Sequence, residues 1–218
     1  MTTLLPSASS SPHAERRLNV FGLSTELVHS AFRPGLSRAT NRTSKALGST
    51  PGTDLYHDTM ESLHLQLAES GWRLVYVDHQ PRLLHPEGLL SFTVASATNV
   101  ADPDRRRQPR TRRKGKATRD SLTADRTGTS SLFEGLETNQ DQELLAAAEA
   151  TPLWLLLHER TDRGLRLELS RPSDMTEGGI VTKWEDRILI AFLDLDGDLS
   201  IFDNPNDSGD IDVRVEPR

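Results

Sequence analysis

Nine basic residues and no acidic residue lie between positions 105 and 119. They are Arg105, Arg106, Arg107, Arg110, Arg112, Arg113, Lys114, Lys116 and Arg119. Most are arginines, and the planar guanidinium group matches the oxygen geometry of phosphates and carboxylates. We therefore predict that this basic segment, residues 105–119, contacts either the backbone of a nucleic acid, without reading its sequence, or an acidic protein surface.

The net charge of the whole chain conceals this segment. The chain has 26 Lys and Arg residues against 32 Asp and Glu residues, a formal net charge of −6. Without the basic segment, 17 basic residues would stand against those 32 acidic residues. From Asp194 onward the sequence is strongly acidic, and only Arg214 and Arg218 oppose that charge. Because opposite charge blocks can pair with each other, the acidic C-terminal residues are an alternative partner for the basic segment.

A second basic stretch, residues 33–45, also contains no acidic residue. Its Ser, Thr and Asn side chains and its backbone amides are able to join arginines in contacting phosphate oxygens. We therefore predict secondary phosphate contacts by Arg38, Arg42 and Lys45. The simpler interpretation is an ordinary polar loop. The stretch contains no glycine-rich nucleotide-binding motif, and we expect no bound cofactor.

Two further groups of residues have the types that metal chemistry needs. His57, Glu61 and His64 are spaced to share one face of a helix, and imidazole and carboxylate groups are metal ligands. Asp162 and Glu168 flank a predicted hairpin strand, as the carboxylates of a metal-dependent nuclease do. The simpler interpretation of each group is an exposed polar surface, which for Glu168 is the solvent face of a half-buried strand.

The hydrophobic pattern predicts helices and strands that would position these residues. We expect a short helix that begins after Ser24 and ends at Arg33-Pro34-Gly35, followed by a loop over residues 35–53. Helices are also predicted near residues 54–70 and 140–150. Strands are predicted near residues 73–78, 89–97, 153–157, 165–170, 184–195 and 211–215. The low apolar content of residues 101–131 predicts a long loop.

These elements predict an α+β fold, with a mostly antiparallel sheet of five or six strands and two main helices. We expect residues 1–53 to be a flexible N-terminal segment that includes one short helix, and residues 1–17 to be disordered. Residues 54–218 are predicted to form a single α+β domain, interrupted by a basic loop at residues 101–135.

Composition excludes several classes of protein. The chain has no Cys, so it has no disulfide scaffold and no thiolate metal site. No apolar run approaches the ~18 residues of a membrane span, and the first residues lack the pattern of a secretory signal. We therefore expect a cytoplasmic protein that does not bind membranes.

The leading functional hypothesis is a non-enzymatic accessory or adaptor protein. It would present the basic segment to a nucleic-acid backbone or to an acidic protein partner. One alternative is a metal-dependent, nuclease-like phosphodiesterase that uses carboxylates near the hairpin at residues 159–168. The other alternative is a structural subunit of a larger protein complex.

Overall fold

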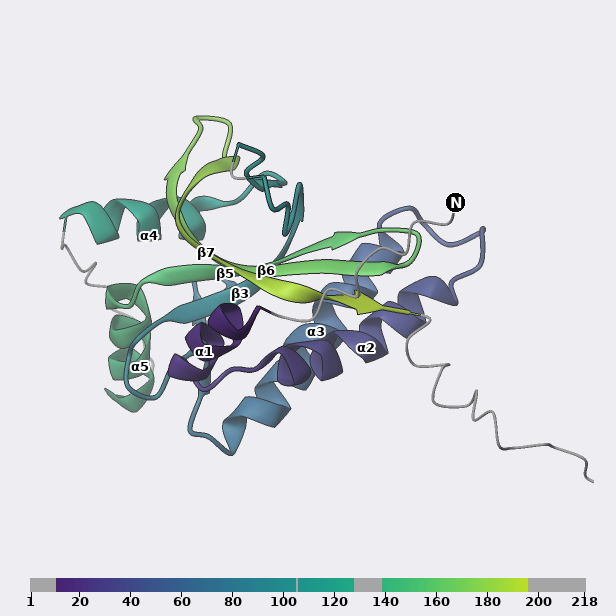
Figure 1. Ribbon diagram of the computed structural model, residues 1–218. Coiled ribbons are helices and arrows are strands. Elements are labelled where there is room, and N and C mark those ends of the chain that lie inside the picture. Colours follow the sequence, from purple (N-terminus) through teal and green to yellow (C-terminus); the bar gives the residue numbers. More distant parts are fainter. Residues whose placement is uncertain (1–10, 105, 128–138, 196–218) are drawn as a thin grey trace, which may run out of the picture.

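The computed structural model describes residues 11–104, 106–127 and 139–195 of the chain. Within these residues, five helices accompany one mixed sheet of seven strands (Figure 1). The main path of the sheet is β1-β2-β3-β5-β6-β7, and the short strand β4 pairs with the edge of β3. Only the β3–β5 pair is parallel, so the predicted α+β class with a mostly antiparallel sheet is confirmed.

The order of elements repeats once along the chain. Each half consists of a helix followed by three antiparallel strands. The first half contains α3 (Thr50–Ala68), β1 (Arg73–Val77), β2 (Gln80–Leu84) and β3 (Ser91–Thr98). The second half contains α5 (Asn139–Ala150), β5 (Leu153–Arg160), β6 (Gly164–Met175) and β7 (Val181–Asp194). The segment between the halves carries β4 (Arg110–Thr111) and α4 (Lys116–Thr127), so the basic segment lies at the junction of the two halves.

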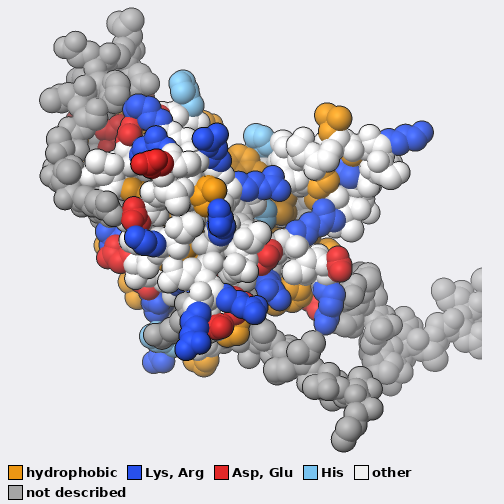
Figure 2. Space-filling view, turned by 90° about the horizontal axis from the view of Figure 1, so that it is seen from above, with side chains coloured by type: hydrophobic (Ala, Val, Ile, Leu, Met, Phe, Trp, Pro, Cys, Tyr) orange, Lys and Arg blue, Asp and Glu red, His pale blue; other side chains and the backbone are white. Residues whose placement is uncertain are grey.

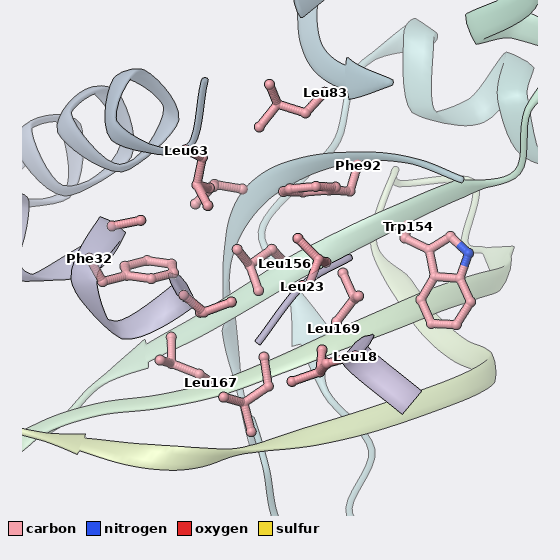
Figure 3. Close-up of a cluster of buried hydrophobic side chains, with 14 of the residues drawn as sticks. Leu18, Leu23, Phe32, Leu63, Leu83, Phe92, Trp154, Leu156, Leu167 and Leu169 are labelled. Atoms are coloured by element: carbon pink, nitrogen blue, oxygen red, sulfur yellow. The ribbon is translucent and has the colours of Figure 1, made fainter. Parts of the chain in front are cut away.

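One face of the sheet carries the main hydrophobic core. The helices α1 (Pro12–Val20), α2 (Thr25–Thr40) and α3 lie together on that face (Figure 1). Their apolar side chains interdigitate with those of β3, β5 and β6, and Figure 3 shows Phe32 and Leu63 beside Leu156. Each of these three side chains is at most 1% exposed. This core supplies the rigid base on which the opposite face is built.

The helix α2 is longer than predicted. Ser24 caps its first turn, because the Ser24 side chain accepts a hydrogen bond from the Leu27 amide. The predicted end at Pro34 and Gly35 is wrong, and the helix continues to Thr40. At Gly35 a Cβ atom would lie 2.9 Å from the Leu55 Cα atom, so this glycine allows α2 and α3 to approach closely. Packing against α3 therefore outweighs the local helix-breaking tendency of these two residues.

Residues 12–40 also differ from the flexible segment that we predicted. They contain α1 and the whole of α2, and Leu18 and Val28 are at most 1% exposed within the main core. The loop predicted over residues 35–53 is shorter in the structure, where it spans only the residues between Thr40 and Thr50. The predicted disorder of residues 1–17 is wrong for residues 12–17, which belong to α1, and residues 1–10 fall outside the described residues.

The strand β2 was not predicted, because Pro81 suggested a break. Pro81 pairs with Tyr76 of β1 in the hairpin. On the other side of β2, the strand β3 pairs only with Leu83 and Leu84. Pro81 therefore lies where no second neighbouring strand needs its missing N–H group. The turn that joins β1 to β2 has positive φ at both Asp78 (45°) and His79 (63°), as a tight hairpin turn of type I′ requires.

The predicted loop over residues 101–131 is only partly a loop. It contains β4 and the helix α4, whose buried residues include Thr118 and Leu122. The Arg82 side chain is fully buried, and its Nη2 atom donates to the Ala117 carbonyl at 3.1 Å. This contact fixes the first turn of α4 on the sheet. The predicted strand at residues 211–215 lies outside the described residues.

Candidate nucleic-acid interface

The described part of the basic segment ends in the first turn of α4 and lies on the sheet face opposite α1, α2 and α3, beside the β6–β7 hairpin (Figure 1). Its backbone is fixed to that hairpin at several points. The Trp184 indole N–H donates to the Pro109 carbonyl at 2.8 Å, and the Lys114 amide donates to the Gly179 carbonyl at 2.7 Å. The Val181 amide donates to the Thr111 hydroxyl at 3.1 Å. The described part of the segment therefore has a defined position on the fold.

Gly179 allows this close approach. Its φ is +81°, a left-handed conformation that favours glycine. A Cβ atom at this position would lie 2.7 Å from the Lys114 carbonyl oxygen. The β6–β7 turn and the basic segment thus hold each other in position.

Two carboxylates hold the chain just before the basic segment. Glu159 accepts a hydrogen bond from the Val100 amide at 3.1 Å, and Glu168 accepts one from the Ala101 amide at 2.6 Å. Asn99 and Ala101 both have positive φ, which is strained for residues with a side chain. The contacts with the two carboxylates therefore stabilise a backbone turn that leads into the basic segment.

Glu168 is not on the solvent face of its strand, as the simpler interpretation of the sequence predicted. Its side chain is fully buried and its two oxygens accept four hydrogen bonds. One comes from Ala101, one from the Ser170 hydroxyl at 2.7 Å, and two from the Arg187 guanidinium at 2.7 and 3.1 Å. Glu168 faces inward because Arg187 and the amide of the preceding turn satisfy its charge.

The structure does not bring the two candidate nuclease carboxylates together. Asp162 is exposed in the turn between β5 and β6, whereas Glu168 pairs with Leu157 farther along the hairpin. The strand from Leu165 to Glu168 alone covers ~10 Å. Among the described residues, no group of three His, Asp or Glu side chains is placed to hold a metal ion. The geometry therefore gives the nuclease hypothesis no support.

The same result applies to the candidate metal ligands on α3. His57 and Glu61 are exposed and His64 is half-buried. The His57 ring packs edge-on against Tyr56, with 5.2 Å between the ring centroids. Among the described parts of the chain these three residues do not form a metal-binding group.

Several side chains of the basic segment contact residues of the same chain. Arg113 donates to the Gly178 carbonyl at 2.8 Å, and Arg119 donates to the Glu177 carbonyl at 3.1 Å. Lys116 forms ion pairs with Asp78 and Asp120, and these hold its pKa above the usual value; the Asp120 hydrogen bond contributes most. Arg107 lies 3.6 Å from Asp102. These contacts tie the segment to its surroundings.

Three other arginines of the segment have no such contact. Arg106, Arg110 and Arg112 are exposed, and their side chains form no ion pair or hydrogen bond with a described residue. Viewed from this side, Lys and Arg side chains are spread over the surface, with Asp and Glu side chains between some of them (Figure 2). Arg105 lies outside the described residues. The structure thus presents, on an anchored backbone, three guanidinium groups that have no acidic partner among the described residues.

Lys114 differs from these arginines because it is half-buried. Burial, and then the nearby charge of Arg112, lower its pKa to about 8. Two features of this region were not predicted from the sequence: the burial of Lys114 and the anchoring role of Trp184. Both depend on contacts between distant parts of the chain, and no local pattern signals them.

The second basic stretch is already neutralised in part. Arg42 makes two hydrogen bonds to Asp54, at 2.7 and 2.8 Å, and these lower the pKa of Asp54. Arg38 lies 3.1 Å from Asp58, and Lys45 is exposed. Two of the three predicted secondary contacts therefore pair with acids of α3.

No protein-family model, no curated protein and no solved structure matches this chain. None of the described helices has both the length and the apolar character needed to cross a membrane. The fold and the site together define an α+β protein with an anchored, arginine-rich surface segment.

Proposed function

We propose that this protein binds the backbone of a double-stranded nucleic acid through the basic segment, as a non-enzymatic accessory or adaptor protein. The observation that carries the proposal is the contrast between a fixed backbone and the charges of Arg106, Arg110 and Arg112, which have no ion pair with a described residue. Because the backbone is already fixed, less conformational freedom is lost when these guanidinium groups bind phosphates.

The surface favours a nucleic acid over a protein partner. Protein interfaces usually contain buried aromatic or large apolar anchors. The exposed large hydrophobic residues of the described chain all lie outside the basic segment, at Val20, Leu47, Leu65, Tyr76 and Leu89. A surface that offers charge without an apolar anchor is suited to a polyanion.

The absence of an aromatic residue from the basic segment favours a duplex over a single strand. Proteins that bind single strands stack bases on aromatic side chains. The basic segment contains no aromatic residue. The adjacent Trp184 is half-buried, and its indole N–H is already bound to Pro109. Contacts to the phosphate backbone alone would not discriminate between sequences.

The test compares wild-type protein with the triple variant Arg106→Ala, Arg110→Ala and Arg112→Ala. A matched control replaces three exposed arginines elsewhere, Arg16, Arg73 and Arg163, with alanine, so that both variants lose the same charge. Affinity for short labelled duplexes and single strands of DNA and RNA is measured by fluorescence anisotropy. We expect tightest binding to a duplex, a large loss in the first variant and a small loss in the control.

Equal binding by wild type and the first variant would reject the proposal. Binding of an acidic protein or peptide, with no binding of any nucleic acid, would also reject it. Circular dichroism of each variant verifies that the fold is retained.

A further inference from the structure

The two edges of the main sheet differ in how the rest of the fold covers them. Along the β7 edge, the Arg17 guanidinium of α1 donates to the Arg187 carbonyl at 3.1 Å. The Nε2 atom of His29, on α2, lies 2.9 Å from the Ala191 carbonyl oxygen. These side chains cover backbone acceptors that a further strand would use. The strand β1 forms the other edge, and among the described residues only β2 makes backbone hydrogen bonds with it.

The hairpin geometry determines which backbone groups of β1 point outward. A turn of type I′ makes its two flanking residues, Val77 and Gln80, a hydrogen-bonded pair. Hydrogen-bonded and non-hydrogen-bonded pairs alternate along an antiparallel ladder, and the register of β1 with β2 has no shift. The N–H and C=O groups of Leu74 and Tyr76 therefore point away from β2. These four groups have no backbone partner among the described residues.

The side chains of the same two residues also suit a further strand. Tyr76 is 61% exposed although it belongs to the sheet, whereas Leu74 is half-buried and packs against the main core. They lie on the same face of β1, because side chains two positions apart in a strand share a face. A facing pair of an aromatic and an aliphatic side chain stabilises antiparallel strands. A strand added at this edge would therefore cover Tyr76 as well as the free backbone groups.

We propose that β1 pairs with β1 of a second copy of this chain, antiparallel and centred on Val75. In this register Leu74 of each copy faces Tyr76 of the other, and their outward groups form four hydrogen bonds between the chains. Two such edges have no other register in which all four outward groups of each strand are paired. The assembly would have one sheet that continues through both chains and a two-fold axis at Val75.

Charge near the ends of β1 is complementary in the same register. Arg73 is exposed and would lie opposite Val77 of the second copy, next to the Asp78 of that copy. The Asp78 side chain is 35% exposed, and its ion pair with Lys116 is long, at 3.5 Å. Surface ion pairs add little affinity, but two symmetric pairs of Arg73 with Asp78 would favour this register. The strand is thus complementary to itself in both backbone and charge, which favours a second copy over an unrelated peptide.

The absence of Cys from the chain allows a test that is specific for this register. In Val75→Cys the two thiols meet at the two-fold axis in a non-hydrogen-bonded pair, where Cα atoms are ~4.5 Å apart and a disulfide fits. In Tyr76→Cys the two cysteines lie diagonally across the axis, ~7–8 Å apart, which is too far for a disulfide. Under mild oxidation of dilute protein, we expect a disulfide-linked dimer from Val75→Cys and little from Tyr76→Cys.

Sedimentation of the wild-type chain over a range of concentrations measures association without any substitution. We expect the fraction of dimer to rise with concentration. Tyr76→Lys should weaken association by about tenfold or more, because a lysine on an edge strand opposes strand pairing. Val20→Lys is the matched control, since Val20 is 67% exposed and belongs to α1, which packs beside the other edge of the sheet. This control should associate as the wild type does.

A wild-type chain that stays monomeric at the highest concentration reached would overturn the proposal. Equal cross-linking of the two cysteine variants would overturn the register, and equal losses in Tyr76→Lys and Val20→Lys would assign the dimer to another surface. Circular dichroism verifies that each variant keeps its fold. The proposal does not depend on nucleic-acid binding, because neither experiment contains a nucleic acid, so its failure would leave the proposed function standing.

Discussion

The two basic stretches look alike in sequence but differ in the structure. Each contains several basic residues and no acidic residue. In residues 33–45, Arg38 and Arg42 pair with acids of the neighbouring helix α3. In the basic segment, Arg106, Arg110 and Arg112 have no ion pair with a described residue. A run of like charge is therefore available to a partner only where the fold leaves that charge without an acidic neighbour.

The largest effect is expected from the carboxylate that holds the start of the basic segment. Changing Glu168 to Ala removes four hydrogen bonds and leaves the largely buried guanidinium of Arg187 without its partner. Breaking a buried ion pair in this way typically lowers the free energy of unfolding by ~3–5 kcal/mol. Urea denaturation provides the measurement.

Asp162→Ala is the matched control, since this carboxylate is exposed in a turn. Its free energy of unfolding should stay within ~0.5 kcal/mol of wild type. Comparable losses in the two variants would show that Glu168 does not have the anchoring role assigned to it. The same two variants, incubated with labelled DNA and Mg²⁺, also test the nuclease alternative.

The next largest effect is expected at Gly179, where the hairpin turn meets the basic segment. Gly179→Ala places a methyl group 2.7 Å from the Lys114 carbonyl oxygen, at a φ of +81°. Strain of this kind amounts to ~1–3 kcal/mol, and relief of it would displace the basic segment. We expect both a lower melting temperature and weaker duplex binding. Gly178→Ala, where the nearest atom is 3.8 Å away, should change neither by much.

A pH dependence is expected from Lys114. Its pKa of about 8 in the folded protein is below the ordinary value of 10.5, so the unfolded chain binds more protons between these values. Stability should therefore rise as pH increases from about 8 to 10.5, by about 1 kcal/mol after allowance for partial exposure. Lys114→Met should remove this part of the rise. Denaturation curves for the two proteins that remain parallel across this range would contradict the assignment.

The smallest effect is expected in the second basic stretch. Arg42→Ala removes an ion pair with Asp54 at the surface, and such solvent-screened pairs contribute little to stability. Because Arg42 is already paired, its loss should also leave duplex affinity nearly unchanged. A loss of affinity similar to that of an Arg110→Ala variant would remove the distinction between the two stretches.

The fold was predicted where local patterns decide the structure. The alternation of Leu165, Leu167 and Leu169 with polar residues indicated a strand, and these three side chains lie in the main core. The continuous apolar run from Leu153 to Leu157 indicated a central strand, which is β5. In both cases the apolar residues of the pattern are the ones that the fold buries.

The errors arose where distant contacts outweigh local preference. The helix α2 continues past Pro34 because Gly35 packs on α3, and α4 forms in a segment of low apolar content that Arg82 holds from β2. The candidate site shows the same limit. The sequence identifies the basic residues, but only the fold separates the unmatched Arg112 from the paired Arg42 and shows that Glu168 is buried.

The most direct test of the account is the salt dependence of duplex binding. It compares the triple variant Arg106→Ala, Arg110→Ala and Arg112→Ala with the triple variant Arg38→Ala, Arg42→Ala and Lys45→Ala. Each lost phosphate contact reduces the slope of log affinity against log salt by about one unit. We expect a reduction of about three units in the first variant and a slope close to wild type in the second. Equal slopes for the two variants would contradict the proposal that the basic segment, and not residues 33–45, makes the phosphate contacts.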